Sequence, residues 1–243
     1  MTLFYVRHGD PTYTPDALTP LGRRQAESVA KRLTLFGLDK IYASTSTRAM
    51  ETALPTCELL KMRPQVVQNF HESWMYNDDA SLSEKDGNIH WSFTHPEIKQ
   101  LLLSKEVRDL GDKWYTHPEI AKFKDFKPVL DRVATAVDGF LANLGYHYDS
   151  EKGMYRVTAE NTEQRVALFA HEGFGKYFLS RVLDIPYPQI ARKTDMTHTG
   201  VTVIRFSAPD EDGYCHARLM TLSNDSHLYR DGLPLRYQNA WRF

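Results

Sequence analysis

The sequence predicts an α/β protein: a three-layer α/β/α sandwich with a mostly parallel, mixed sheet. Short apolar runs typical of buried strands alternate with stretches whose apolar residues recur at helical spacing. Two of these runs stop abruptly at charged or imidazole residues, Arg7 and His171, as buried strands do at a sheet edge. The last two runs, 200–206 and 214–222, surround a turn-rich segment and therefore indicate an antiparallel pair.

Composition limits the class of protein. The chain has 243 residues, 42% of them hydrophobic, and a formal net charge of −1. This length suits a single domain over 1–243. The balanced charge excludes a global field for nucleic acid or an acidic membrane, and no apolar run approaches the ~20 residues of a membrane span. Cys57 and Cys215 are too few for a disulfide framework, and no secretion signal opens the sequence, so we expect a cytoplasmic protein.

The first part of the chain predicts two strand and helix pairs. Each strand is a short run of apolar and β-branched residues, and each helix starts behind a hydroxyl cap. Pro55 should kink or divide the second helix. The expected order is a strand at 3–6, a helix capped by Thr19 that runs to Gly37, a strand at 38–43 and a helix that begins near Arg48.

Residues 70–126 break this pattern, because aromatic and charged residues alternate there without a clear period. We predict a helical insertion over the active site. A Thr-His-Pro-Glu-Ile sequence occurs twice, at 94–98 and 116–120. Thr-x-x-Glu is the spacing of a capping box, so each copy should open a short helix. The aromatic side chains either form an apolar lid over a ligand or pack the insertion against the core.

The last part of the chain returns to regular patterns. An apolar stripe at helical spacing follows Pro128, and a turn-rich segment separates two short strand patterns. The expected order is a helix from Pro128, a hairpin at 146–148 and 154–157, a strand at 165–170, a helix through Val182 and the final strand pair.

Charged and imidazole groups follow three predicted strands. Arg7 and His8 come after the first strand, Arg48 after the second and His171 after a late one. Ligands of α/β sheets bind beyond the carboxyl ends of the strands, so these groups should converge. Such a cluster repels itself, and a compact dianion such as phosphate would neutralise it. Because no P-loop, no Cys-x5-Arg loop and no aspartate-rich magnesium motif accompanies the cluster, the candidate nucleophile is the imidazole of His8 or of His171.

Four sequence blocks together resemble the histidine phosphatase superfamily, also called the phosphoglycerate mutase-like family, in its phosphatase-type branch. They are the strand that ends in Arg-His-Gly at 3–9, Leu-Thr-Pro-Leu-Gly at 18–22, Ser-x-x-x-Arg-Ala-x-Glu-Thr-Ala at 44–53, and 167–173. A lone Arg-His-Gly tripeptide is a weak signal. The blocks occur in order, three of them at predicted strands, and they spread over nearly the whole chain.

The resemblance implies a metal-independent phosphomonoesterase, without a cofactor, that acts on a small phosphorylated substrate through a phosphohistidine. His8 would be the nucleophile, Arg7 and Arg48 would hold the phosphoryl oxygens, and His171 would complete the pocket. Glu72 stands where the family often places its proton donor.

Departures from the family pattern concern the substrate. Thr14 replaces an asparagine that helps mutases hold phosphate, and its hydroxyl makes it a substrate-binding candidate. Glu172 is a second candidate, although its charge opposes a dianion unless the side chain turns toward Lys176 or solvent. Ser-Trp-Met-Tyr at 73–76 replaces the Arg-His-Tyr-Gly of mutases, which favours a phosphatase.

Three alternatives stay open. The first is a mutase of the same chemistry, separated from a phosphatase by isomer formation instead of phosphate release. The second is a phosphoryl-binding module without turnover. The third is a metal-dependent hydrolase, prompted by the 10 histidines, although those outside the motifs are expected to be surface or capping groups. Glu84 and Asp86 are less favoured substitutes for Glu72 as proton donor.

Overall fold

A computed structural model describes residues 1–79, 81–82 and 89–235, and the chain forms two compact units. The first comprises Met1–His71, Leu144–Glu172 and the chain from Asp195 onward, and the second comprises Glu72–Asn143 and Gly173–Thr194. The second unit begins close to the predicted start of the insertion at residue 70, and it contains more of the chain than 70–126. The organisation as a single domain stays a prediction.

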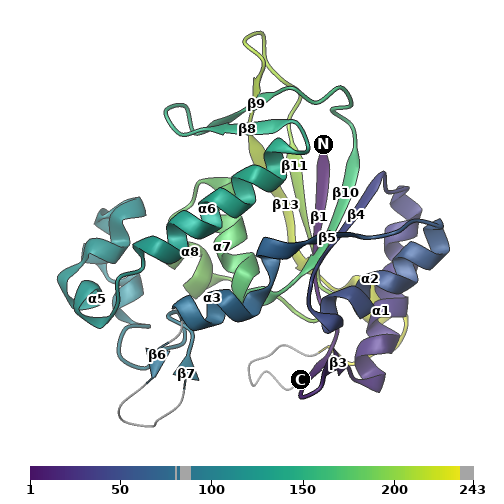
Figure 1. Ribbon diagram of the computed structural model, residues 1–243, viewed down its shortest axis with the longest axis horizontal. Helices are drawn as coiled ribbons and strands as arrows, with labels where there is room; N and C mark the ends of the chain where they lie inside the picture. Colours follow the sequence, from purple (N-terminus) through teal and green to yellow (C-terminus); the bar gives the residue numbers. More distant parts are fainter. Residues whose placement is uncertain (80, 83–88, 236–243) are drawn as a thin grey trace. The chain divides into compact units, whose positions relative to one another are not determined.

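A six-stranded mixed sheet forms the centre of the first unit (Figure 1). The spatial order is β13 (Ala217–Asn224), β11 (Val201–Phe206), β1 (Thr2–Arg7), β10 (Arg165–Ala170), β4 (Lys40–Ser44) and β5 (Gln65–Val67). Four neighbouring strands, β1, β10, β4 and β5, run parallel to one another. Strand β11 pairs antiparallel with β1, and β13 pairs antiparallel with β11. The predicted α/β class and the mostly parallel mixed sheet are confirmed.

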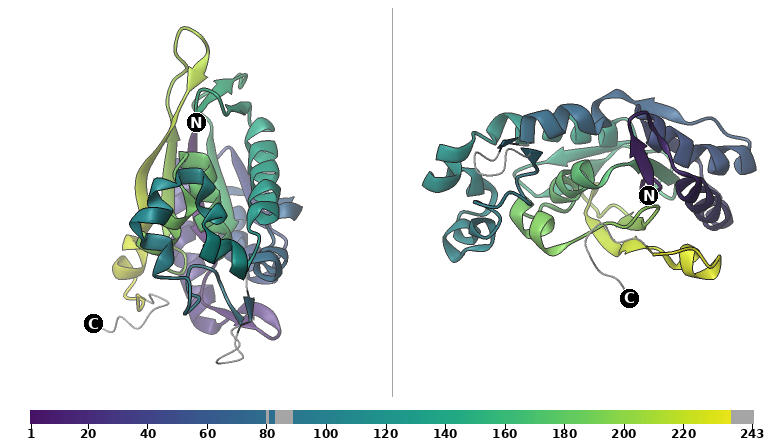
Figure 2. Two further views of the ribbon diagram at one scale, coloured as in Figure 1. Left: turned by 90° about the vertical axis from the view of Figure 1, so that its left-hand side faces the viewer. Right: turned by 90° about the horizontal axis from the view of Figure 1, so that it is seen from below.

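Helices α1 (Pro20–Leu33) and α2 (Thr47–Leu60) pack on one face of this sheet (Figure 2). Thr19 caps α1 as predicted, and Ser46 caps α2. The expectation that Pro55 divides the second helix is wrong, because α2 continues through it. Apolar contacts with the sheet outweigh the backbone hydrogen bond that proline removes. The shared core comprises Phe4, Val6, Val29, Leu33, Leu38, Ile41, Ala43, Ala53, Cys57, Ala167, Phe169 and Val201.

Smaller elements complete the first unit. The predicted hairpin is present, and a third short strand joins it, because the predicted strand at 214–222 is split between two sheets. These elements are the pair β2 (Pro11–Tyr13) and β3 (Asp16–Leu18), the sheet of β8 (Tyr146–Asp149), β9 (Met154–Val157) and β12 (Tyr214–Cys215), and helix α9 (Ser226–Arg230).

The second unit is mainly helical, and its aromatic residues pack inside it. The ring of Trp114 lies 5.1 Å from that of Phe126 and 5.5 Å from that of Tyr187. Its elements are α3 (Glu72–Asp79), β6 (Ser81–Leu82), β7 (Ile89–His90), α4 (Lys105–Asp109), α5 (Pro118–Phe123), α6 (Lys127–Ala142), α8 (Tyr187–Lys193) and the part of α7 (Glu172–Leu183) from Gly173 onward. No helix among the described residues is long and apolar enough to cross a membrane.

The repeated Thr-His-Pro-Glu-Ile sequence behaves differently from the prediction. Only the second copy opens a helix, α5, and its cap is His117, whose ring accepts the backbone NH of Glu119. The first copy forms turns, in which His95 accepts the NH of Glu97 in the same way. The imidazole therefore replaces the expected threonine as the capping group.

Candidate active site

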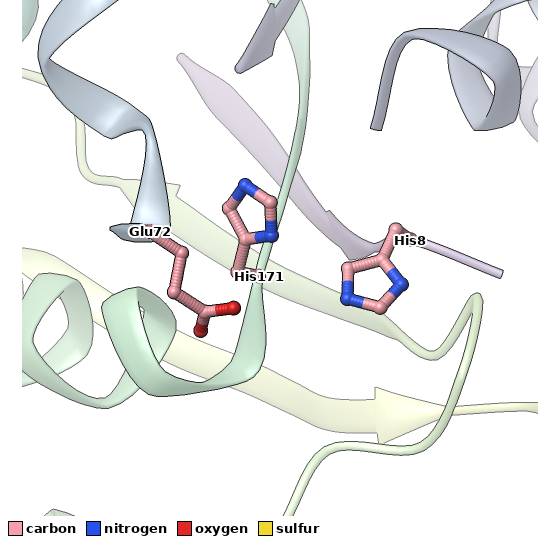
Figure 3. Close-up of side chains that lie close together, drawn as sticks. All are labelled: His8, Glu72 and His171. Atoms are coloured by element: carbon pink, nitrogen blue, oxygen red, sulfur yellow. The ribbon is translucent and has the colours of Figure 1, made fainter. Parts of the chain in front are cut away.

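The carboxyl ends of three parallel strands bring the predicted cationic groups together. The registers of β1, β10 and β4 align the last residues of these strands. His8 follows β1, His171 follows β10, and Arg48 lies in the first turn of α2, directly after β4. Figure 3 shows the side chains of His8 and His171 at their strand ends. Their ring centroids lie 5.4 Å apart. Arg7, the last residue of β1, is 1% exposed beside them.

His8 is a buried, neutral imidazole with a defined proton position. Its Nδ1 lies 2.8 Å from the carbonyl oxygen of Gly9. A carbonyl only accepts, so Nδ1 carries the proton and Nε2 is left with its lone pair. Burial holds the pKa of His8 well below its usual value, and the charges of Arg7, His171 and Arg48 lower it further. At neutral pH this ring is therefore ready to act as a nucleophile.

His171 carries its proton on the other nitrogen. The Nη2 of Arg48 lies 3.2 Å from Nδ1 of His171, and a guanidinium only donates, so Nδ1 accepts. The Nε2–H then donates to the hydroxyl of Ser44 at 2.8 Å, with Ser46 farther away at 3.4 Å. The pKa of His171 is also well below its usual value, because of burial and then of Arg48, His71 and Arg7. These contacts make His171 a fixed, neutral partner.

Arg7 is paired with Glu172, which settles where that carboxylate points. Nη1 of Arg7 lies 2.8 Å from Oε2 of Glu172, and the two side chains are 1% and 7% exposed. The same nitrogen donates to the carbonyl of Met196. The side chain of Glu172 therefore lies against Arg7 and is turned away from solvent. It neutralises and orients the arginine.

Arg48 is held in a comparable way by the hairpin of β2 and β3. Its Nη1 lies 2.8 Å from Oδ1 of Asp16, and its guanidinium lies 5.3 Å from the centre of the ring of Tyr13. The other carboxylate oxygen of Asp16 accepts the NH of Thr47 at 2.8 Å. Thr14 is exposed in the turn between these two hairpin residues. The turn thus carries Thr14 beside the residues that hold Arg48, and its role as a substrate ligand stays a prediction.

Glu72 begins α3 in the second unit, where Figure 3 labels it. Its Oε1 accepts the NH of Gly173 at 2.9 Å. A Cβ at Gly173 would lie 2.7 Å from that oxygen and 2.6 Å from the ring of Trp91, so glycine is required for this contact. The alternative donors Glu84 and Asp86 lie outside the described residues.

Sequence reasoning missed three buried polar residues around His8. The hydroxyl of Ser44 bonds the ring of His171, the ring of His198 lies beside that of His8, and Asp10 pairs with His198. The expectation that histidines outside the motifs are surface or capping groups is wrong for His198, since this residue is 6% exposed. No local sequence pattern identifies His198, because it lies beside His8 only as a result of the pairing of β11 with β1.

Cys57 and Arg63 also have the Cys-x5-Arg spacing of cysteine-dependent phosphatases. Cys57, however, lies inside α2, and burial raises the pKa of its thiol to about 11. A nucleophilic cysteine needs a lowered pKa and an accessible loop, so this spacing does not form a phosphate site.

Comparisons with known proteins agree with this geometry. The model of the histidine phosphatase superfamily (branch 1) matches residues 3–212. A mycobacterial glucosyl-3-phosphoglycerate phosphatase has 20% identity and a TM-score of 0.57, covering 92% of this chain and 98% of its own. A phosphoserine phosphatase from Entamoeba histolytica with 3-phosphoglyceric acid has 18% identity, a TM-score of 0.56 and coverages of 93% and 98%. Bacillus stearothermophilus YhfR has 22% identity, a TM-score of 0.56 and the same coverages.

These likenesses to solved structures show the fold. None of the curated proteins compared with the sequence matches it. The family model spans most of the chain and includes the three strand ends that carry Arg7, His8, Arg48 and His171. The chain therefore belongs to the histidine phosphatase superfamily, branch 1.

Proposed function

We propose that this protein is a phosphomonoester hydrolase that works through a phosphohistidine on His8. The observation that carries the proposal is the state of His8: a buried neutral ring with Nδ1–H bonded to Gly9 and Nε2 unprotonated, next to Arg7 and Arg48. A neutral imidazole is the form that attacks phosphorus, and the two guanidinium groups stabilise charge on the phosphoryl oxygens.

The proposed reaction has two steps. Nε2 of His8 attacks phosphorus, an N–P bond forms, and the P–O bond to the leaving alcohol breaks while Glu72 supplies the proton that the alkoxide takes. Water then attacks the phosphohistidine, gives a proton back to the Glu72 carboxylate, and releases phosphate and neutral His8. The NH of Gly173 donates to Oε1 of Glu72, and Gly173 follows His171 by two residues in the chain. This contact supports the assignment of Glu72 as the proton donor.

Arg7 and Arg48 are proposed to bind the phosphoryl oxygens, and Thr14 to contact the substrate. His171 is proposed to join them by transferring its Nε2–H bond from the hydroxyl of Ser44 to a phosphoryl oxygen. Glu172 is better explained as the partner of Arg7, because its carboxylate is already engaged at 2.8 Å. We propose a small phosphorylated substrate, since the similar proteins act on glucosyl-3-phosphoglycerate or phosphoserine. The cytoplasm is the proposed compartment, in line with two buried, free cysteines.

A trapping experiment tests the mechanism. The protein is mixed with 32P-labelled esters, including phosphoserine and glucosyl-3-phosphoglycerate, and is quenched in base, which preserves phosphohistidine. We expect label on His8, none in His8→Ala, and normal labelling in a control, His147→Ala, whose imidazole is exposed on β8. Activity that persists in His8→Ala would contradict the proposal.

The same assay separates the alternatives. A hydrolase releases one phosphate per alcohol, whereas a mutase returns an isomer of the ester. Binding of phosphate without turnover of any ester would indicate a binding module. Activity is expected to survive EDTA, and loss on chelation with rescue by Zn²⁺ would favour a metal-dependent hydrolase.

A further inference from the structure

His198 lies against the candidate nucleophile. It belongs to the segment that joins α8 to β11 and is 6% exposed. Its ring centroid lies 5.7 Å from that of His8, with the two planes inclined by 33°. His171 contacts the same imidazole at 5.4 Å with an inclination of 62°. The ring of His8 therefore touches two other imidazoles, and only His171 belongs to the predicted phosphate pocket.

Asp10 lies beside His198. Its Oδ1 lies 3.5 Å from Nδ1 of His198, and both side chains are nearly buried, at 11% and 7% exposure. The carboxylate is itself anchored, because Oδ2 accepts the hydroxyl of Thr19 at 2.7 Å and the backbone NH of Asp10 donates to Gln25 at 2.8 Å. The orientation of His198 thus derives from the first turns of α1.

The backbone fixes the same contact. The NH of Thr199 lies 3.1 Å from the carbonyl of Arg7 and 3.3 Å from that of His8, so the residue after His198 is bonded to the nucleophile's own strand end. Thr199 has φ of +56°, a conformation that a β-branched residue rarely adopts. Its hydroxyl bonds the carbonyl of His198 at 2.7 Å and Nε2 of His227 at 3.0 Å. Strain of this kind persists only where surrounding contacts impose it, and it clusters at functional sites.

We propose that His198 is a positioning residue, which, oriented by Asp10, holds the plane of the His8 ring so that Nε2 faces the phosphorus atom. The inference rests on the proposed function of His8. The Nδ1–H bond to Gly9 fixes one edge of the ring, but rotation about that edge swings Nε2 away from its target. A second ring packed beside His8 at an inclination of 33° limits this rotation, and attack requires such alignment.

Kinetics of three variants test the positioning role. His198→Ala removes the ring, His198→Phe keeps a ring without the Asp10 contact, and Asp10→Asn keeps both rings while weakening their orientation. With p-nitrophenyl phosphate we expect the single-turnover rate to fall about tenfold in His198→Ala and less in His198→Phe, with KM changed by less than twofold. The matched control is His95→Ala, which removes a histidine that is buried, at 1% exposure, in the second unit, and should leave the rate unchanged.

Side-chain NMR separates this inference from the proposed function. Long-range 1H–15N spectra report which nitrogen of His8 carries the proton. We expect a single Nδ1–H form of His8 in the wild type, and exchange broadening or a mixture of tautomers in His198→Ala. If His198→Ala does not fold, Asp10→Asn should show the same change in the His8 signals. Unchanged His8 signals, or a wild-type single-turnover rate in a folded variant, would overturn the inference. A wild type that hydrolyses no ester would refute the proposed function, while the spectra would still test the positioning of His8.

Discussion

Neutralising Glu172 should make the protein less stable and make it bind phosphate more tightly. Arg7 and Glu172 form a pair at 2.8 Å whose side chains are 1% and 7% exposed. Removing one partner of a buried ion pair leaves an uncompensated charge and costs about 3–5 kcal/mol. Glu172→Gln keeps a side chain that fills the same space, so we expect the lower value, about 3 kcal/mol. At this chain length that corresponds to a fall in Tm of about 6–12 °C.

Phosphate should partly restore the variant. In Glu172→Gln the carboxylate of residue 172 no longer competes with phosphate for Arg7, and we expect the Kd of inorganic phosphate to fall about tenfold, which is about 1.4 kcal/mol. A ligand that binds only the folded state stabilises it by RT ln(1 + [L]/Kd). The stability deficit of Glu172→Gln should therefore shrink from about 3 to about 1.6 kcal/mol in saturating phosphate.

Urea unfolding with and without phosphate, together with calorimetric titration of phosphate, measures both effects. The control is Glu119→Gln, because Glu119 pairs with Lys122 at 2.6 Å and both side chains are more than half exposed. Exposed pairs of this kind contribute little, so no measurable change is expected there. Equal stability of the two variants, or weaker phosphate binding by Glu172→Gln, would refute the reasoning. The second result would return Glu172 to the substrate-binding role that the sequence suggested.

Three further predictions concern other parts of the first unit. Burial and the charge of Arg32 lower the pKa of His227 to about 4, so only the unfolded state takes up this proton between pH 6.5 and 4. The free energy of unfolding should therefore fall by about 3 kcal/mol as the pH falls over that range. Urea unfolding at several pH values should show a smaller fall in His227→Gln. Asp16→Asn removes the carboxylate that pairs with Arg48, so kcat/KM should fall about tenfold while Tm changes little. An unchanged kcat/KM would exclude Asp16 as the residue that orients Arg48. A Cβ at Gly22 would lie 2.2 Å from the carbonyl oxygen of Asp10. Gly22→Ala should therefore lower the free energy of unfolding in urea by about 1–3 kcal/mol. The control Gly139→Ala places its Cβ in open space beside α6 and should not lower it.

Local patterns were sufficient to predict the strand ends and the helix starts. An apolar run that stops at Arg7 identifies the end of β1, and a hydroxyl before Pro20 identifies the start of α1, because both signals depend on neighbouring residues alone. The convergence of Arg48 and His171 could be predicted as well, since it follows from the rule that parallel strands end at the same edge.

Contacts set by the tertiary structure could not be predicted. Pro55 does not divide α2, because packing against the sheet compensates for the lost hydrogen bond, and that packing is invisible in a local window. His198 lies far from His8 in the sequence and meets it because β11 pairs with β1. The pairing of Glu172 with Arg7 depends on the tertiary structure, and the local spacing suggested only Lys176 or solvent.

The charge balance of the site shapes how phosphate is bound. Each of the two arginines has a carboxylate partner, Glu172 for Arg7 and Asp16 for Arg48, and both histidines at the strand ends are neutral. The cluster that would repel itself is therefore stable without a ligand, in a chain whose net charge is only −1. In the proposed site a phosphoryl group would compete with these carboxylates for the guanidinium groups, and we expect this competition to weaken the binding of both substrate and product phosphate. Weaker binding of substrate and product does not slow the chemical step where additional contacts stabilise the charge of the transition state. Weaker binding of the product also speeds the release of phosphate. Tighter phosphate binding in Glu172→Gln should therefore be accompanied by stronger product inhibition, which a steady-state assay with added phosphate measures.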